Sequence, residues 1–180
     1  MNIITTTTPN LSPLVCLRDL LVEELRCLYH AESQLLTVFP KMAKAATHPE
    51  LREAFEVQAS ETRLQLKRLE KIMRKRGYTS IGGSCEAMRG LITEVETTLR
   101  RDLPPSVKDL TLIGTAQKIA HYTMAGYSTA NAFAELSGDM DTTDALMETV
   151  EDTEVAQGVL QEISARIEIP QETLQGAVAD

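Results

Sequence analysis

Helical periodicity constrains the fold of this chain more than any other feature of its sequence. From residue 17 onward, apolar side chains recur every three or four positions through four stretches of roughly 25 to 30 residues each. Valine and isoleucine never alternate with polar residues over the length of a strand. The 180 residues suffice for one domain with a sizeable core, and the periodicity predicts that this domain is all-α.

Proline and glycine mark the expected ends of the long helices. Ser12-Pro13 and Pro49 are typical of helix starts, whereas Gly77 and Ser137-Gly138 are typical of helix ends. Pro40 is expected to bend or end the first helix. The four long helices are therefore predicted over residues 13–46, 49–76, 106–136 and 141–167.

A shorter helix is predicted between the second and third long helices. Ser84 can cap it, and Pro104-Pro105 follows its end. Ser106 and Asp109 then resemble a capping box for the next helix. The layout predicts a ferritin-like four-helix bundle over residues 12–167, with one crossover that carries a short fifth helix. Residues 1–11 are expected to form a flexible arm and residues 168–180 a C-terminal tail.

The charge of the chain argues against some partners. The formal net charge is −8, so general affinity for nucleic acid or for an anionic membrane is not expected. Seven basic residues lie between Arg63 and Arg76, and eight acids lie between Glu148 and Asp180. The basic group complements the dipole at a helix C-terminus, or the two opposite groups meet across a subunit or partner contact.

The cysteines and the apolar runs bear on localisation. Cys16, Cys27 and Cys85 are an odd number without a CxxC motif, and we expect free thiols in a reducing compartment. No apolar run approaches a membrane span, and the first residues lack the pattern of a signal peptide. A cytoplasmic protein is predicted.

Polar side chains on the apolar stripes are the candidates for chemistry. A di-iron bundle needs several carboxylates and typically a Glu-x-x-His pair from each of two helices. No Asp or Glu stands three or four residues from His30, His48 or His121, so no histidine has this spacing. The candidates on the four predicted long helices are Glu32, Gln58, Glu61, Gln65, His121 and Asp152.

Several segments resemble the YciE/YciF-type family of bacterial ferritin-like proteins. The resemblance covers Leu17 to about Ile167, and the phrases that carry it include "LRCLYHAE", "ETRLQLKRLEKI", "AQKIAHYTMAGYSTANAFAE" and "METVEDTEV". It implies a ferritin-like fold, a homodimer and a role in stress responses. It also implies a di-metal centre, which many members are thought to hold.

The metal ligands that the resemblance implies are only partly present. The acids of the first and second helices correspond to Glu32 and Glu61. Gln58 and Gln65 stand where the family has histidines. The resemblance therefore leaves Glu32 and Glu61 as a degenerate metal site, with Gln58 and Gln65 around it.

The third and fourth helices depart further from the family pattern. Ala120 and Thr123 replace the two acids that flank the histidine corresponding to His121. The ligand position of the fourth helix falls at Thr153, next to Asp152. We therefore expect His121 to be a structural or supporting residue, with Asp152 or Glu154 reaching in only if a weak metal site survives.

Two carboxylates alone are too few to balance two divalent cations. Without cations they would repel, and we expect one of them to be protonated or hydrogen-bonded to Gln58, Gln65 or Tyr29.

Three functions remain open from the sequence. The first is a metal-free structural or interaction protein, a homodimer with an unknown protein partner and no cofactor. The second is a di-iron or di-manganese oxidase, or a peroxide-consuming protein, with an unusual ligand set. The third is a binder of a small ligand in the vacated metal cavity. No Gly-rich phosphate loop or Ser-His-acid constellation adds an alternative, and the interpretation leans away from an enzyme.

Overall fold

The computed structural model describes residues 14–79 and 84–174. These ranges contain no strand, which confirms the all-α prediction. The predicted arm at 1–11 and the predicted start at Ser12-Pro13 lie outside the described residues. The helices are α1 (Leu17–Ala45), α2 (Pro49–Lys75), α3 (Glu86–Arg100), α4 (Pro105–Leu136), α5 (Met140–Arg166) and the single turn α6 (Gln171–Leu174), which falls in the segment expected to be a tail.

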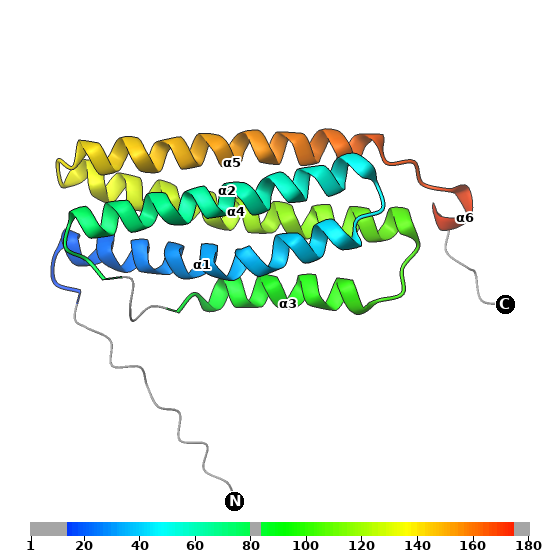
Figure 1. Ribbon diagram of the computed structural model, residues 1–180, viewed down its shortest axis with the longest axis horizontal. Helices are drawn as coiled ribbons and strands as arrows, with labels where there is room; N and C mark the ends of the chain where they lie inside the picture. The colour runs from blue at the N-terminus through cyan, green and yellow to red at the C-terminus, as the bar shows by residue number, and fades with distance from the viewer. Residues whose placement is uncertain (1–13, 80–83, 175–180) are drawn as a thin grey trace, which may run out of the picture.

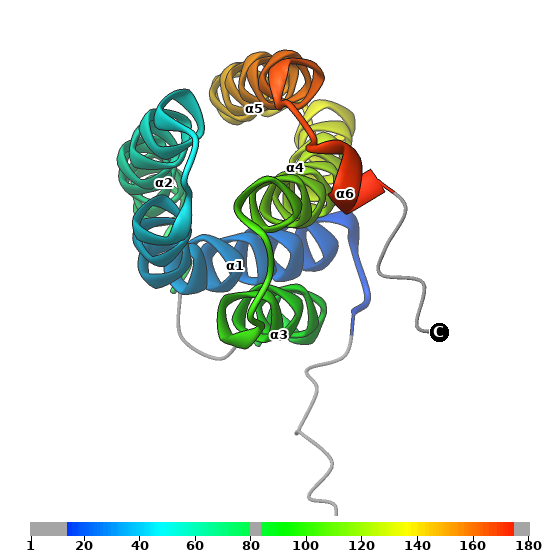
Figure 2. The same ribbon diagram turned by 90° about the vertical axis from the view of Figure 1, so that its right-hand side faces the viewer.

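The four long helices form a bundle in which each helix has two long neighbours. Helix α1 packs against α2 and α4, and α5 packs against the same two helices from the other side. Along the bundle these neighbours run antiparallel (Figure 1). Helix α3 carries the crossover and lies outside the bundle, against α1 and α4 (Figure 2). The ferritin-like layout with one crossover is confirmed.

Two glycines end long helices as predicted. Gly77 follows α2 with φ of 69°, and Gly138 follows α4 with φ of 70°, conformations that residues with a Cβ rarely adopt. The amide of Tyr78 donates to the carbonyl of Met73, so the chain closes the end of α2 with a backbone hydrogen bond of 2.8 Å. These local signals set the lengths of the two helical hairpins.

Two local predictions need correction, and the two alternatives for Pro40 are decided. Helix α1 runs through Pro40 to Ala45, and Pro40 therefore does not end the helix. Cys85 rather than Ser84 occupies the N-cap position of α3. Helix α4 begins at Pro105, so Ser106 and Asp109 do not form its capping box.

Asp109 instead fastens the α1–α2 turn to α4. Its carboxylate is buried and accepts hydrogen bonds from the amides of Thr47 and His48, both at 2.9 Å, and from the Thr47 hydroxyl at 2.5 Å. Three donors compensate for the loss of water around this charge.

The core of the bundle has an apolar cluster at each end and a polar layer between them. One cluster includes Leu35 and Phe55, and the other includes Leu25 and Leu146. At the level where the clusters meet, each long helix turns a buried polar side chain inward. These side chains are Glu32 of α1, Thr62 and Gln65 of α2, Thr123 of α4 and Thr153 of α5.

Candidate functional site

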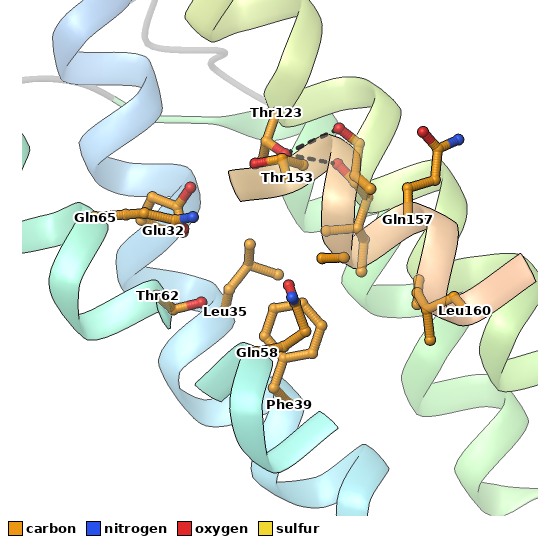
Figure 3. A pocket seen from close by; sticks show the side chains of 14 residues that line it. Glu32, Leu35, Phe39, Gln58, Thr62, Gln65, Thr123, Thr153, Gln157 and Leu160 are labelled. Atoms are coloured by element: carbon orange, nitrogen blue, oxygen red, sulfur yellow. Dashed lines mark hydrogen bonds between the residues drawn. The ribbon is translucent and has the colours of Figure 1, made fainter. Parts of the chain in front are cut away.

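The polar layer surrounds a small cavity at the centre of the bundle (Figure 3). All four long helices contribute to its lining, which mixes apolar side chains with polar ones. Its volume of about 20 Å³ has room for one or two water-sized molecules. The polar lining residues are Glu32, Gln58, Thr62, Gln65, Thr123, Thr153 and Gln157.

Glu32 is the one carboxylate among the described residues that line the cavity. It is 1% exposed, and its Oε1 accepts a hydrogen bond of 3.1 Å from the Tyr127 hydroxyl. Its Oε2 is buried without a hydrogen-bond partner within the described structure. Burial raises the pKa of Glu32 to about 8, against the opposing effect of the Tyr127 hydrogen bond. At neutral pH the side chain is therefore mostly a neutral carboxylic acid.

Tyr127 of α4 is the main polar contact of Glu32 and was not among the partners expected from the sequence. It is 1% exposed, and burial, followed by the nearby Glu32, raises its pKa well above the ordinary value. Tyr29, one of the expected partners, donates to Glu70 at the surface. Of the expected alternatives, a protonated carboxyl agrees with the raised pKa of Glu32, and its hydrogen bond comes from Tyr127 rather than from Tyr29.

The remaining polar groups of the cavity are uncharged. The hydroxyl of Thr123 donates to the carbonyls of Ile119 and Ala120, and that of Thr153 donates to the carbonyl of Thr149. These hydroxyls satisfy their own helices and present only oxygen lone pairs to the cavity. Thr62 and Gln65 add a hydroxyl and an amide from α2.

An ion-pair cluster around Arg68 lies towards the surface between α2 and α5. Arg68 donates to the Thr149 hydroxyl and to Glu148, both at 2.5 Å, and lies 3.4 Å from the carboxylate of Asp152. Asp152 therefore pairs with Arg68 and does not line the cavity. Glu154 is exposed on the outside of α5.

Two further predicted site residues also lie outside the cavity lining. Glu61 is half-buried, and the neighbouring Thr62 takes the inward position on α2. His121 is exposed, with its Nε2 at 2.6 Å from the side-chain amide nitrogen of Gln157. Gln157 lines the cavity, so His121 reaches this site only through that amide. The structure thus brings together Glu32, Gln58 and Gln65, but leaves Glu61, His121 and Asp152 apart from them.

This donor set does not fit the di-metal centre that the resemblance implies. Two divalent cations need several carboxylates to neutralise and bridge them, and the cavity supplies one, with a raised pKa. Over residues 14–79 and 84–174, no three His, Cys, Asp or Glu side chains form a group that could hold a metal ion.

Comparisons with known proteins agree with the family resemblance. The family described as "Domain of unknown function (DUF892)" matches residues 16–173, nearly the whole described chain.

The chain belongs to the DUF892 family.

One DUF892 relative is Protein YciF of Escherichia coli (strain K12), which is 32% identical over 137 residues, or 76% of this chain and 82% of that protein. The crystal structure of the E. coli stress protein YciF matches with a TM-score of 0.82 at 29% identity, covering 84% and 96% of the two chains. YcfI of Rhodopseudomonas palustris, for which a structural role has been suggested, matches with a TM-score of 0.77 at 32% identity, covering 82% and 94%.

The sequence interpretation missed a second polar cluster in this DUF892 protein, between α1, α3 and α4. The hydroxyl of Tyr122 lies 2.9 Å from Sγ of Cys85 and 3.5 Å from Sγ of Cys27. Cys27 and Cys85 are far apart in the sequence, and no motif connects them. Only the packing of the crossover helix on α1 brings them together.

Proposed function

We propose that this DUF892 protein works without a di-metal centre, as a structural or interaction protein associated with stress. The observation that carries the proposal is the lining of the central cavity, which has one carboxylate where a di-metal bundle needs several. The names of its relatives support a structural role associated with stress, because YciF is called a stress protein and a structural role has been suggested for YcfI.

The volume of the cavity speaks against a binder of small ligands, and its lining speaks against a di-metal oxidase. Pockets for small molecules usually enclose about 300–1,000 Å³, whereas this cavity has a volume of about 20 Å³. A di-metal oxidase would have to draw further carboxylates into the cavity, and the nearest candidate, Asp152, is held by Arg68. The cavity suits a buried water next to Glu32, whose Oε2 lacks a protein partner within the described residues.

The proposal is tested by the metal content of the protein from cells grown with added iron and manganese. We expect far less than one metal ion per chain by mass spectrometry, and no peroxide consumption above that of the buffer. A Glu32→Gln variant should not change either value. A matched Glu61→Gln variant, which alters the predicted acid outside the cavity lining, serves as the control.

A metal content near two ions per chain would contradict the proposal, above all if Glu32→Gln abolished it and Glu61→Gln did not. Such a result would mean that additional ligands complete the centre when metal is present.

We further propose that the protein is a homodimer that associates through the outer faces of α2 and α5. Exposed apolar side chains lie on these faces, and a groove of about 300 Å³ between the two helices includes Val57 and Val159. The α2 face also exposes Lys67 and Lys71, and the α5 face exposes Glu151. A two-fold axis would set Lys67 and Lys71, in the C-terminal half of α2 of one copy, against Glu151 of the other.

The mass of the protein in solution, measured by light scattering after size-exclusion chromatography, tests this interface. We expect a dimer for the natural chain and a monomer for Leu64→Glu, which places a charge on an exposed α2 position. Leu20→Glu alters a side chain on α1 that is also exposed, and it should remain a dimer. A monomeric natural chain, or a Leu64→Glu variant that remains a dimer, would contradict the interface.

The proposed location is the cytoplasm, because the three cysteines are free thiols and reducing conditions preserve them. Separately, none of the described helices combines the length and apolarity needed to cross a bilayer. The acidic net charge supports the absence of nucleic-acid partners.

A further inference from the structure

Two cysteines and a tyrosine from three separate elements meet away from the central cavity. Cys27 belongs to α1, Cys85 occupies the N-cap of α3, and Tyr122 belongs to α4. The Tyr122 hydroxyl lies within hydrogen-bond distance of both sulfur atoms, at 3.5 Å for Cys27 and 2.9 Å for Cys85. Both thiols therefore contact one and the same hydroxyl group. We refer to Cys27, Cys85 and Tyr122 as the thiol cluster.

The packing of the crossover holds Cys85 against α1. The side-chain amide of Gln34 on α1 donates to the carbonyl of Cys85 at 3.4 Å, and Arg26 donates to the carbonyl of Thr79 at 2.9 Å, before the α3 segment begins. Cys85 is 2% exposed and Cys27 is half-buried. The contact of both thiols with Tyr122 is thus built into the fold.

The surroundings of the two sulfur atoms favour a thiolate at Cys85 and a thiol at Cys27. The hydrogen bond from the Cys27 thiol lowers the pKa of Cys85 to about 6, against the opposing effect of burial. The Tyr122 hydroxyl, the amide of Met88 at the start of α3 and nearby His30 lower it further. The same contact with Cys85, together with burial, raises the pKa of Cys27. The Tyr122 hydroxyl is also closer to Sγ of Cys85 (2.9 Å) than to Sγ of Cys27 (3.5 Å), which favours Cys85 as the attacking sulfur.

Glu24 is the one acidic neighbour that affects this balance among the described residues. It is half-buried on α1, and burial followed by the charge of Cys85 raises its pKa. The hydrogen-bond donors near the sulfur of Cys85 favour the negative charge of the cluster at that atom.

We propose that Cys27 and Cys85 form a dithiol that reacts with hydrogen peroxide and closes to an intramolecular disulfide. In the first step the Cys85 thiolate attacks one oxygen of the peroxide. The O–O bond breaks, Cys85 becomes a sulfenic acid, and hydroxide leaves. In the second step the sulfur of Cys27 attacks the sulfur of Cys85, the S–O bond of the sulfenic acid breaks, and a disulfide forms. The departing hydroxide takes up the proton of the Cys27 thiol and leaves as water.

The reaction balances in atoms and electrons. Two thiols lose two electrons and two protons in total, and one peroxide molecule is reduced to two molecules of water. The Tyr122 hydroxyl, 2.9 Å from Sγ of Cys85, can stabilise the thiolate before the attack. The resulting disulfide would link α1 to the beginning of the crossover helix.

This inference does not rest on the proposed absence of a di-metal centre, because the thiol cluster shares no residue with the cavity lining. Cys16 provides an internal comparison. It is exposed at the start of α1, where its Sγ donates to Asp19, an acidic neighbour that does not favour a thiolate. If accessibility alone decided reactivity, Cys16 would react before the thiol cluster.

The test treats the full, reduced chain with one equivalent of hydrogen peroxide at pH 7. Remaining thiols are then alkylated and the peptides are mapped by mass spectrometry. We expect a loss of two of the three thiols, a peptide pair linked through Cys27 and Cys85, an alkylated Cys16, and full recovery of thiols with dithiothreitol. The Cys16→Ser variant should form the same linked pair.

Two variants separate the chemistry from accidental oxidation. In Cys27→Ser the disulfide should be absent, and dimedone should trap the sulfenic acid at Cys85. Tyr122→Phe keeps the ring but removes the hydroxyl, and it should slow the loss of thiols several-fold. Circular dichroism confirms that each variant is folded. The proposal is overturned if Cys16 is consumed while Cys27 and Cys85 remain alkylatable, or if a tenfold excess of peroxide leaves all three thiols intact.

Discussion

The central cavity and the thiol cluster each bury an acidic group in the same helical bundle, but the pKa of that group is raised in one and lowered in the other. Glu32 is buried with a single hydrogen-bond donor, and its pKa rises to about 8. Cys85 is almost as deeply buried, but it has donors from Cys27, Tyr122 and the start of α3, and its pKa falls to about 6. The number of donors around the buried atom, together with its burial, decides which acid carries a charge.

The largest expected effect on the free energy of unfolding comes from Glu32, the one carboxylate among the described residues that line the cavity. The folded protein holds a proton on Glu32 up to about pH 8, whereas the unfolded chain releases it near the ordinary value of 4.5. Between these values the folded state binds more protons, so the free energy of unfolding should fall as the pH rises. The slope reaches at most about 1.4 kcal/mol per pH unit, and the loss is complete above pH 8.

Urea unfolding of the natural chain and of Glu32→Gln at pH 5, 7 and 9 measures this effect. The variant should lack this contribution to the slope, so its stability relative to the natural chain should increase with pH. Glu61→Gln is the control and should follow the natural chain. Parallel curves for the natural chain and Glu32→Gln would mean that Glu32 is ionised in the folded protein and has a partner for its charge.

The thiol cluster should show the next largest effect when it is oxidised. A disulfide between Cys27 and Cys85 closes a loop of roughly 60 residues and should stabilise the fold by about 2–4 kcal/mol, chiefly by restricting the unfolded chain. Thermal unfolding of the oxidised and reduced protein measures the change, and Cys27→Ser should show none. A lower melting temperature after oxidation would mean that the disulfide distorts the contact between α1 and α3.

The smallest effect on stability is expected from Tyr127, which donates a hydrogen bond to Glu32. Tyr127→Phe removes the hydroxyl but keeps the ring, so it should cost about 1–2 kcal/mol, because Glu32 loses its hydrogen bond. Urea unfolding at pH 6 measures the cost. Tyr29→Phe, which removes a hydroxyl at the surface contact with Glu70, should cost less. Equal costs in the two variants would mean that Glu32 gains nothing from Tyr127.

The helices and their ends could be predicted from the sequence because their signals are local. Gly77 and Gly138 end α2 and α4 through their own backbone conformations, and the apolar stripe placed Glu32 inside. Asp109 shows the limit of this reasoning, since a residue that resembles a local cap in fact binds the turn between two other helices.

The candidate site was harder to predict because it depends on how each helix is rotated. Neighbouring helical residues point about 100° apart, so a small rotation of α2 decides whether Glu61 or Thr62 faces the cavity. The thiol cluster left no local signal at all. Cys27 and Cys85 meet only because the crossover helix returns along α1, which is a property of the tertiary fold.

The charge state of Glu32 is the central claim about the cavity, and carbon-13 NMR of its side-chain carboxyl measures it most directly. The signal is assigned by its absence in Glu32→Gln, and it is titrated in metal-free protein and again with excess zinc as a diamagnetic divalent cation. We predict a pKa near 8 in both titrations. A pKa at or below 4.5 in the metal-free protein would mean that the cavity carries a charge. A pKa that falls sharply when zinc is added would mean that the cavity holds a metal.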